Sequence, residues 1–196
     1  MNKPSRRLRY NVAISLDGFI VPLDEKKVWI VHDNGTFFDA LHAQCDTVVM
    51  GRKTYDCMCS MGEHNPLQRY SKESLVVVSK TLRSEHHPRV TIVSENFIRY
   101  VTDLKNTGGR DIWLMGGGQL AGPCLDAGIL DTVEAAIMPL MLRKGGRMAG
   151  ESVLTPLGGV KLELVDCSQW ETSGIVVCKY KVSRQMVASL GDAMFC

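Results

Sequence analysis

The stretch Asp111-Ile-Trp-Leu-Met-Gly116-Gly117-Gly118-Gln119-Leu120 is an apolar run that meets three consecutive glycines and then residues that suit a helix start. It predicts a buried strand followed by a helix. Glycines at such a junction let the backbone approach a pyrophosphate, and the N–H groups and dipole of the helix N-terminus favour an anion. The pattern is neither G-x-G-x-x-G nor a P-loop. It indicates a phosphate-binding turn, with a purely structural tight turn as the alternative.

Two more apolar runs end in residues of the same character. Residues 46–51 and 75–79 read as buried strands, and each is followed by hydroxyl and cationic side chains. Arginine offers a planar fork to a phosphate, and lysine offers a point charge. If the three strand ends lie side by side at the carboxyl edge of one sheet, they form a crevice for a phosphorylated dinucleotide. Each cation alone would be an ordinary surface residue. The candidate ligands are Gly51, Arg52, Lys53, Thr54, Ser79 and Lys80.

The loop after the first predicted strand, residues 10–15, contains the pair Asp17-Gly18. A carboxylate in an apolar loop could hold the ring nitrogens or a ribityl hydroxyl of a heterocyclic substrate, and burial would alter its pKa. The same pair also suits a plain turn, and spacing alone does not separate the two interpretations. Trp29 and Asp33 follow downstream.

The order of these patterns predicts a single α/β domain over residues 1–196. Strands at 10–15, 47–50, 75–79, 90–94 and 111–115 alternate with helices, which implies right-handed crossovers and a mainly parallel sheet. The helices are expected after Thr36 as N-cap, at 98–104, and at 120–125, where Pro123 would be confined to the first turn. Residues 131–142, 161–168 and 175–182 have no helix between them and predict an antiparallel set at one edge. Residues 144–150 and 155–159 are expected to be loops.

Composition narrows the functional classes. The chain has 196 residues, 45% of them hydrophobic and 22% charged, with a net charge of +2, so it offers no broad surface for nucleic acid or an anionic membrane. No apolar run approaches the roughly 20 residues of a spanning helix, and no apolar leader follows the basic N-terminal residues. The seven scattered cysteines are expected to be reduced thiols in a cytoplasmic protein, and they suggest no metal site.

Taken together, these motifs resemble the family that joins dihydrofolate reductase to the reductase domain of riboflavin biosynthesis, the RibD C-terminal domain, and especially its stand-alone members. The resemblance covers about residues 9–182. It implies a dihydrofolate-reductase-like three-layer fold, with a central, mostly parallel mixed sheet, helices on both faces and antiparallel C-terminal strands. Its carriers, in the family's order, are residues 15–20, 46–55, 77–80, 112–121 and 127–131.

The resemblance also implies NADPH as the hydride donor. Gly116, Gly117, Gly118, Gln119 and Leu120 would bind its pyrophosphate, while Arg52, Lys53 and Thr54 after Gly51 would surround the adenosine phosphates. Ser79 and Lys80 would select the 2′-phosphate. Trp29 and the backbone near Val21 would border the nicotinamide, Asp17 would face the substrate and supply the catalytic carboxylate, and Asp33 would contact the substrate. A homodimer is implied for the riboflavin-type branch.

Two departures from the family pattern concern the substrate. Riboflavin-type reductases often carry Lys or Arg directly after the Asp-Gly pair, where this chain has Phe19. Dihydrofolate reductases place an acidic residue on the first helix shortly after a Trp, whereas Asp33 precedes the predicted helix. The leading hypothesis is therefore reduction of a ribosylaminopyrimidine 5′-phosphate or a related small heterocycle. Dihydrofolate reduction and a nucleotide-binding module without catalysis remain the alternatives.

Overall fold

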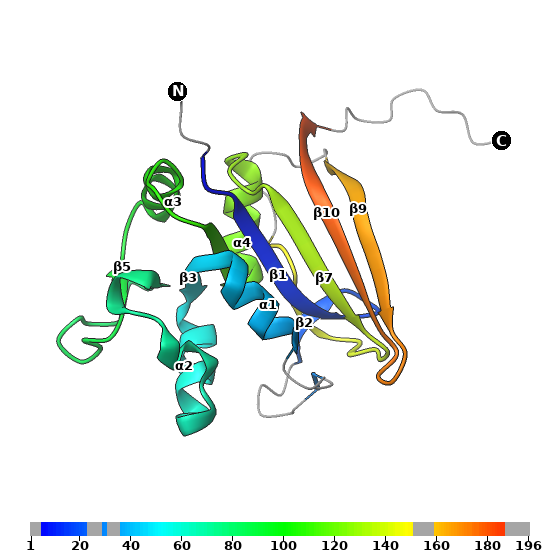
Figure 1. The fold of residues 1–196 in the computed structure, drawn as a ribbon, viewed down its shortest axis with the longest axis horizontal. Coiled ribbons are helices and arrows are strands. Elements are labelled where there is room, and N and C mark those ends of the chain that lie inside the picture. The colour runs from blue at the N-terminus through cyan, green and yellow to red at the C-terminus, as the bar shows by residue number, and fades with distance from the viewer. Residues whose placement is uncertain (1–4, 23–28, 31–35, 151–158, 187–196) are drawn as a thin grey trace.

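The computed structural model describes residues 5–22, 29, 30, 36–150 and 159–186, which form ten strands and four α-helices (Figure 1). The helices are α1 (Thr36–Gln44), α2 (Arg52–Ser60), α3 (Phe97–Lys105) and α4 (Gly118–Asp126). The strands are β1 (Leu8–Ser15), β2 (Phe19–Pro22), β3 (Cys45–Gly51), β4 (Leu75–Val78), β5 (Thr91–Val93), β6 (Asp111–Gly116), β7 (Thr132–Met138), β8 (Gly145–Arg147), β9 (Val160–Trp170) and β10 (Ile175–Met186). Three short 3₁₀ turns at 62–64, 66–69 and 72–74 lie between α2 and β4.

Eight strands make one sheet in the order β5-β4-β3-β6-β1-β7-β10-β9, and β2 and β8 form a separate two-stranded ribbon. Every neighbouring pair from β5 to β7 is parallel. The last two strands differ, because β10 runs antiparallel to both β7 and β9. The expected mostly parallel mixed sheet with antiparallel C-terminal strands is confirmed, and parallel order brings the carboxyl ends of β4, β3, β6 and β1 to one edge.

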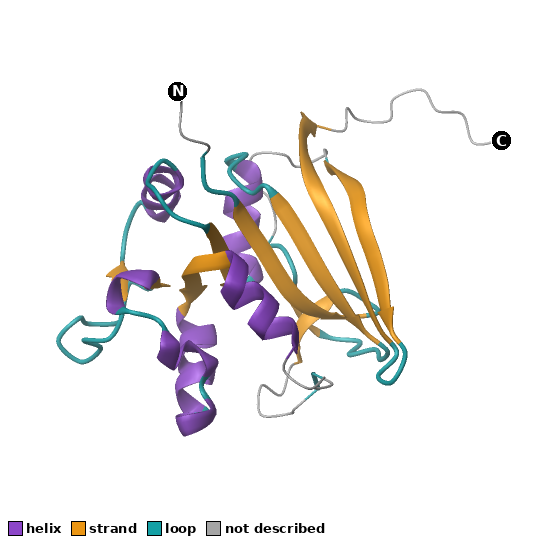
Figure 2. Ribbon diagram, in the orientation of Figure 1, coloured by secondary structure: helices purple, strands orange, loops and turns teal. Residues whose placement is uncertain are grey.

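Helices cover both faces of the parallel half of the sheet (Figure 2). Along β6, Ile112 and Leu114 face one core, with side chains of α3 and α4, whereas Trp113 faces a second core with Leu41 of α1. This alternation is the period-2 geometry of a strand whose two faces are both buried. It explains why the sequence of β6 is a continuous apolar run, and it leaves only the strand ends free for ligands.

The expected antiparallel set is present, but its first strand is shorter than expected. Residues 131–142 were expected to be one strand, whereas β7 ends at Met138; it pairs antiparallel with β10 and, on its other side, parallel with β1. Pro139 has no N–H for the ladder, and the N–H of Leu140 instead donates to the carbonyl of Met138 (2.8 Å), which turns the chain. The strand continues the parallel order, and its end joins the same edge as the others.

Two smaller expectations were also wrong. The glycine-rich stretch 144–150 was expected to be a loop, but residues 145–147 form β8, which pairs with β2. Pro123 was expected in the first turn of a helix, but it lies inside α4. A proline there leaves the carbonyl four residues back without its helical partner, and Gln119, which carries that carbonyl, is exposed to water. The helix after Thr36 is present and begins at that residue.

Candidate cofactor and substrate site

The three glycine- and cation-bearing strand ends meet at one edge of the sheet. In the register of the sheet, Gly51 of β3 pairs with Val78 of β4, and Met50 pairs with Gly116 of β6. A Cβ atom on Gly51 would lie 3.8 Å from Cδ1 of Leu120, and one on Gly116 would lie 3.6 Å from Oγ1 of Thr54. The ends of β3 and β6 and the first turns of α2 and α4 therefore form one surface, as the sequence predicted.

The turn from β6 into α4 is built for close backbone approach. Gly116 has φ 141°, a conformation that side chains rarely adopt. A Cβ atom on Gly118 would lie 2.2 Å from the carbonyl oxygen of Arg147, because residues 147–149 cross this point of the helix. In the first helical turn the N–H of Leu120 donates to the carbonyl of Gly117 (2.9 Å), whereas Gly118 and Gln119 have no carbonyl one turn earlier in the helix to accept their N–H groups. The turn thus combines N–H groups that the helix itself does not use with a glycine that the chain requires.

Arg52 links the start of α2 to the end of β4. Its Nη1 donates to Oγ1 of Thr81 (2.6 Å), and its Nε donates to Asp56 (3.2 Å). The buried hydroxyl oxygen of Ser79 accepts hydrogen bonds from the backbone N–H groups of Thr81 (3.3 Å) and Leu82 (3.2 Å). In this arrangement the Ser79 side chain holds the turn after β4, while Lys53 of the same helix start is exposed.

A groove of about 540 Å³ lies where β4 and β5 end. It is lined by Lys80, Arg83, Ser94, Glu95 and Asn96. Only Lys80 was predicted. The signal for the rest was present, because residues 90–94 were expected to be a parallel strand, and Ser94 and Glu95 stand at its carboxyl end. Arg83 had no such signal, since its place depends on the turn that Ser79 holds.

Asp17 supports the loop that follows β7. The Ser15 hydroxyl donates to its Oδ1 (2.6 Å), and the backbone N–H groups of Leu142 and Arg143 donate to its two oxygens (3.1 and 2.7 Å). The Ser15 hydrogen bond, followed by the two backbone bonds, lowers the pKa of Asp17. A carboxylate kept ionised in this way suits a positioning residue better than a proton donor. Its catalytic role stays a prediction.

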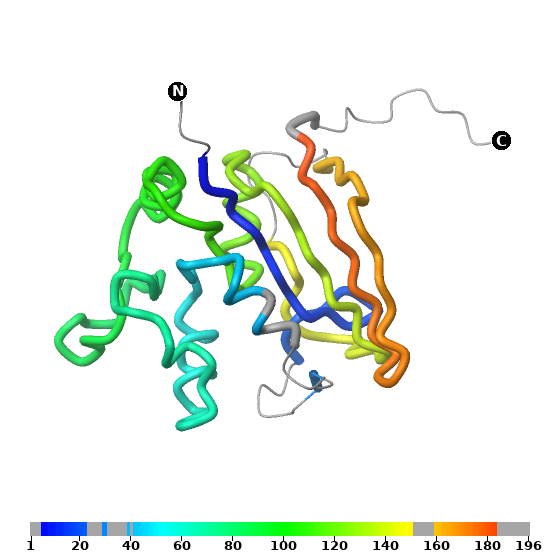
Figure 3. The backbone as a smooth tube through the Cα atoms, in the orientation of Figure 1, coloured from blue at the N-terminus to red at the C-terminus, as the bar shows by residue number. Residues whose placement is uncertain are grey.

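The segments of β2 and β8 lie side by side in the backbone trace (Figure 3), and their pairing brings an arginine to the position where the family pattern often has a cation and this chain has Phe19. Phe19 pairs with Arg147, and the guanidinium carbon of Arg147 lies 5.0 Å from the centre of the Phe19 ring, which is within cation–π range. Next to Phe19, Cδ1 of Ile20 lies 3.7 Å from where a Gly117 Cβ would be. The exposed Arg147 therefore borders the glycine turn. Local sequence patterns could not predict this contact, because 128 positions separate Phe19 from Arg147.

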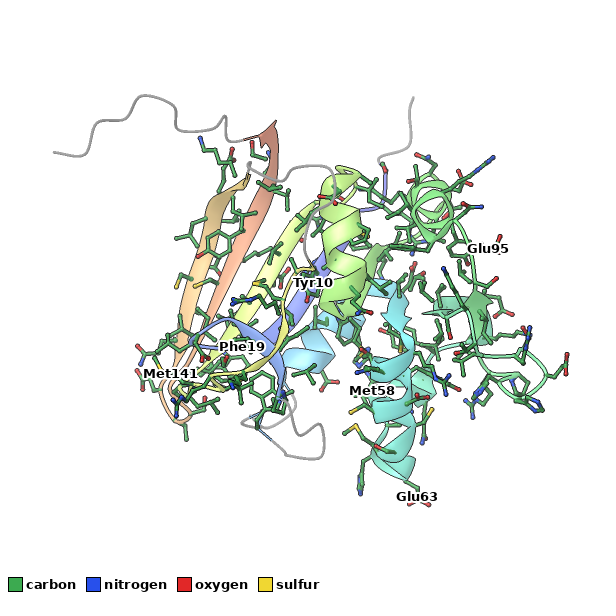
Figure 4. All side chains as sticks on the ribbon, turned by 180° about the vertical axis from the view of Figure 1, so that it is seen from behind. Tyr10, Phe19, Met58, Glu63, Glu95 and Met141 are labelled. Atoms are coloured by element: carbon green, nitrogen blue, oxygen red, sulfur yellow. The ribbon has the colours of Figure 1, made fainter. Side chains whose placement is uncertain are left out.

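The other residues predicted at the site are Val21, Trp29 and Asp33. The backbone of Val21 lies in β2 against Gly145, and a Cβ on that glycine would be 1.9 Å from the Val21 carbonyl oxygen. Trp29 packs on a small cluster formed by Ala136, Met138 and Ile175. Asp33 lies outside the described residues. Seen from behind, Phe19 and Glu95 stand on opposite sides of α4 and α2 (Figure 4), so the candidate site extends along the whole edge.

Comparison with known proteins agrees with this geometry. The family model described as the RibD C-terminal domain matches residues 6–177. The uncharacterized protein YyaP of Bacillus subtilis (strain 168) is 29% identical over 156 residues, which are 74% of this chain and 80% of YyaP.

Two solved structures show the same fold. A putative riboflavin biosynthesis protein from Shewanella sp. PV-4 has a TM-score of 0.69 at 23% identity, and the match covers 91% of this chain and 99% of that one. Dihydrofolate reductase from Enterococcus faecalis, solved with NADP(H), has a TM-score of 0.59 at 14% identity, with 90% and 96% covered. The family match extends over most of the sequence, including every strand end described above, and the chain therefore belongs to the RibD C-terminal domain family.

Proposed function

We propose that this protein is an NADPH-dependent reductase that transfers a hydride to a ribosylaminopyrimidine 5′-phosphate or a closely related heterocycle. One observation carries the proposal: the glycine turn of α4, the cationic start of α2 and the groove with Lys80 and Arg83 share one edge of the sheet. The phosphates of a dinucleotide lie in a line between its two ring systems. The anion-binding groups of the protein also follow one another in a line along this sheet edge.

The residues fit such a cofactor in three places. The first turn of α4 offers N–H groups to the pyrophosphate, and the positive φ of Gly116 brings the backbone there without a side chain. Arg52 and Lys53 stand at the N-terminus of α2, where an anion is also favoured. The 2′-phosphate would lie near Lys80 and Arg83. Glu95 in the same groove opposes that anion, so the preference for NADPH over NADH rests on two cations against one carboxylate.

Arg147 supports a phosphorylated substrate. Its guanidinium lies on Phe19 beside the glycine turn, and it is exposed. Arginine binds phosphate with paired hydrogen bonds, and an aromatic face beneath it restricts the side chain without using its donors. In this proposal Arg147 takes the place of the cation that relatives often carry after the Asp-Gly pair. It would hold the substrate's phosphate while the heterocycle lies deeper, toward the end of β1.

The chemistry requires orientation more than acid–base groups. Bound NADPH supplies the hydride, and the protein contributes position and electrostatics. The hydrogen bonds from Leu142 and Arg143 to Asp17 hold the loop after β7 beside the end of β1. The pairing of β2 with β8 then fixes Phe19 and Arg147 at the mouth of the site. Each of these contacts positions a wall of the site.

The cofactor assignment is tested by titrating the protein with NADPH and NADH separately, following tryptophan quenching and energy transfer to the dihydronicotinamide. Tighter binding of NADPH by tenfold or more supports the site. Absence of binding by both would contradict the reductase assignment. Turnover is then measured with a ribosylaminopyrimidine 5′-phosphate, with dihydrofolate as the comparison substrate.

The substrate assignment is tested with Arg147→Met. Loss of a hydrogen bond to a charged group costs about 1.5–3 kcal/mol, so the KM for the phosphorylated substrate should rise by about 10- to 100-fold. The dephosphorylated analogue should show no such change, and NADPH affinity should stay within twofold. Arg89→Met, an exposed arginine before β5, is the matched control. An equal rise in KM for both substrates would remove Arg147 from phosphate binding.

We also propose that the protein is a homodimer of the cytoplasm. The edge strand β9 exposes Leu162 (40%), Leu164 (60%) and Val165 (60%), and an uncovered apolar edge strand invites pairing with another chain. A second copy would cover it. Light scattering should give twice the chain mass, and Leu164→Lys should give the monomer. The free thiols found among the described residues support a reducing compartment, and no described helix is both long enough and apolar enough to cross a membrane.

A further inference from the structure

Two cysteines face each other across the outermost pair of strands. Cys167 of β9 is directly opposite Cys178 of β10, and their sulfur atoms are 3.4 Å apart. Opposite residues of antiparallel strands have Cα atoms about 4.5 or 5.5 Å apart, and both values lie within the range of about 4.4–6.8 Å found in disulfides. The sulfurs need to approach by only about 1.3 Å to reach bonding distance.

We propose that Cys167 and Cys178 form a reversible disulfide when the protein meets a low-molecular-weight disulfide such as oxidised glutathione. Cys167 is exposed and Cys178 is only 8% exposed, so the two sulfurs have different roles. The Cys167 thiolate attacks one sulfur of the reagent and releases the first glutathione thiolate. The Cys178 thiolate then attacks the Cys167 sulfur and releases the second. Two protein thiols are oxidised, and one small disulfide is reduced to two thiols.

The other described cysteines do not offer an equivalent pair. Cys57 and Cys59 are both exposed on α2, but residues two apart on a helix do not face each other. Cys45 and Cys124 are fully buried in opposite cores, so neither the other thiol nor a dissolved disulfide reaches them. The pairing of β9 with β10 thus singles out one site among the described thiols.

The disulfide would act as a clamp on the edge strand. Residues 161–169 of β9 all have exposed side chains, so the strand is held mainly by its ladder to β10. Cys178 itself is next to Ala135 of β7 in the register of the sheet. A covalent link at this position joins the edge strand to the strand that anchors it. Oxidation should therefore slow opening of β9, whereas reduction restores a freer edge.

The test is oxidation of the purified protein by oxidised glutathione, followed by mass spectrometry of intact chains and of unreduced peptides. The hydrogen bond with Cys178 raises the pKa of the Cys167 thiol, so the reaction is run at pH 8.5. The wild type should yield one peptide pair linking Cys167 to Cys178, two hydrogens lighter than the two thiol peptides together, whatever glutathione the exposed Cys57 and Cys59 carry. Cys178→Ser should instead keep one glutathione on Cys167, and Cys167→Ser should give neither product.

Two controls keep the result specific. A Cys57→Ser/Cys59→Ser double variant should form the same disulfide as the wild type, and Leu164→Lys removes any second copy that would shield Cys167. Oxidised protein should melt about 5 °C higher and exchange the amide hydrogens of 162–168 at least tenfold more slowly than reduced protein. Linkage of any other cysteine pair, or covalent dimers in place of the intrachain bond, would overturn the proposal.

Discussion

Replacing Gly118 with alanine tests the most crowded contact at the candidate site. The new Cβ would lie 2.2 Å from the Arg147 carbonyl oxygen and 3.1 Å from the carbonyl carbon of Met148. Both atoms are backbone, so the loop 147–149 must move by about 1 Å to reach an ordinary contact distance. Overpacking of this kind costs about 1–3 kcal/mol, and the rigid neighbours favour the upper value. The gain from alanine in a helix offsets up to about 1 kcal/mol.

The expected net loss for Gly118→Ala is therefore about 2 kcal/mol, or a fall in Tm of about 4–8 °C for a chain of this length. Urea unfolding and calorimetry measure both quantities. Gly146→Ala is the matched control, because its Cβ would meet only side-chain atoms of Val21, Cβ at 3.6 Å and Cγ2 at 3.9 Å, both ordinary contact distances. Since the displaced loop carries Arg147, Gly118→Ala should also weaken substrate binding. Equal stability of both variants would refute the claim that residues 147–149 pack on the helix start.

Three further substitutions test how charged side chains affect stability and cofactor binding. Arg9→Met leaves the nearly buried carboxylate of Glu134 with Lys179 as its remaining cation, and urea unfolding should show a loss of about 3 kcal/mol; a loss below 1 kcal/mol would mean that the pair is solvated. The ionised Asp17 carboxylate, whose pKa is lowered in the folded protein, stabilises the fold above the unfolded pKa of about 4. This contribution is lost as the pH falls through the folded pKa. The Tm of Asp17→Asn should therefore fall less than the wild-type Tm between pH 6 and 3, and parallel curves would contradict the assignment. Glu95→Gln should tighten NADPH about threefold at low salt and leave NADH unchanged; an equal effect on both would place the 2′-phosphate elsewhere.

The sequence predicted the strands most accurately where an apolar run forms a strand that is buried on both faces of the sheet. Apolar runs ending in Gly51 and Gly116 predicted two parallel strands and the sheet edge of the candidate site, because a strand buried on both faces has no alternation to obscure its ends. The same logic failed at β7, where a run of apolar residues continues past Pro139 although the strand does not. A proline that ends a ladder is a stronger signal than the hydrophobicity that surrounds it.

Local sequence patterns could not predict contacts of residues whose position depends on pairing between two strands. Arg147 follows a glycine-rich stretch that resembles an ordinary loop, and only its pairing with Phe19 brings it to the site. Likewise, Cys167 and Cys178 looked scattered until β9 and β10 aligned them. Ser79 shows a different limit, since its position at a strand end was predicted but the two hydrogen bonds that its hydroxyl oxygen accepts from the following turn were not. Its role toward a ligand stays a prediction.

The segment after β7 connects the two halves of the candidate site. Asp17 binds the backbone of Leu142 and Arg143, β2 pairs with 145–147, and the N–H of Gly150 donates to the carbonyl of Gly118 (2.9 Å). Residues 142–150 thus contact the proposed substrate wall at one end and the candidate phosphate-binding helix α4 at the other. A glycine is required wherever they cross another backbone, at Gly118 and Gly145. These glycines and Asp17 serve the site by fixing one loop, and the groups that would touch ligands, such as Arg147, depend on that loop for their position.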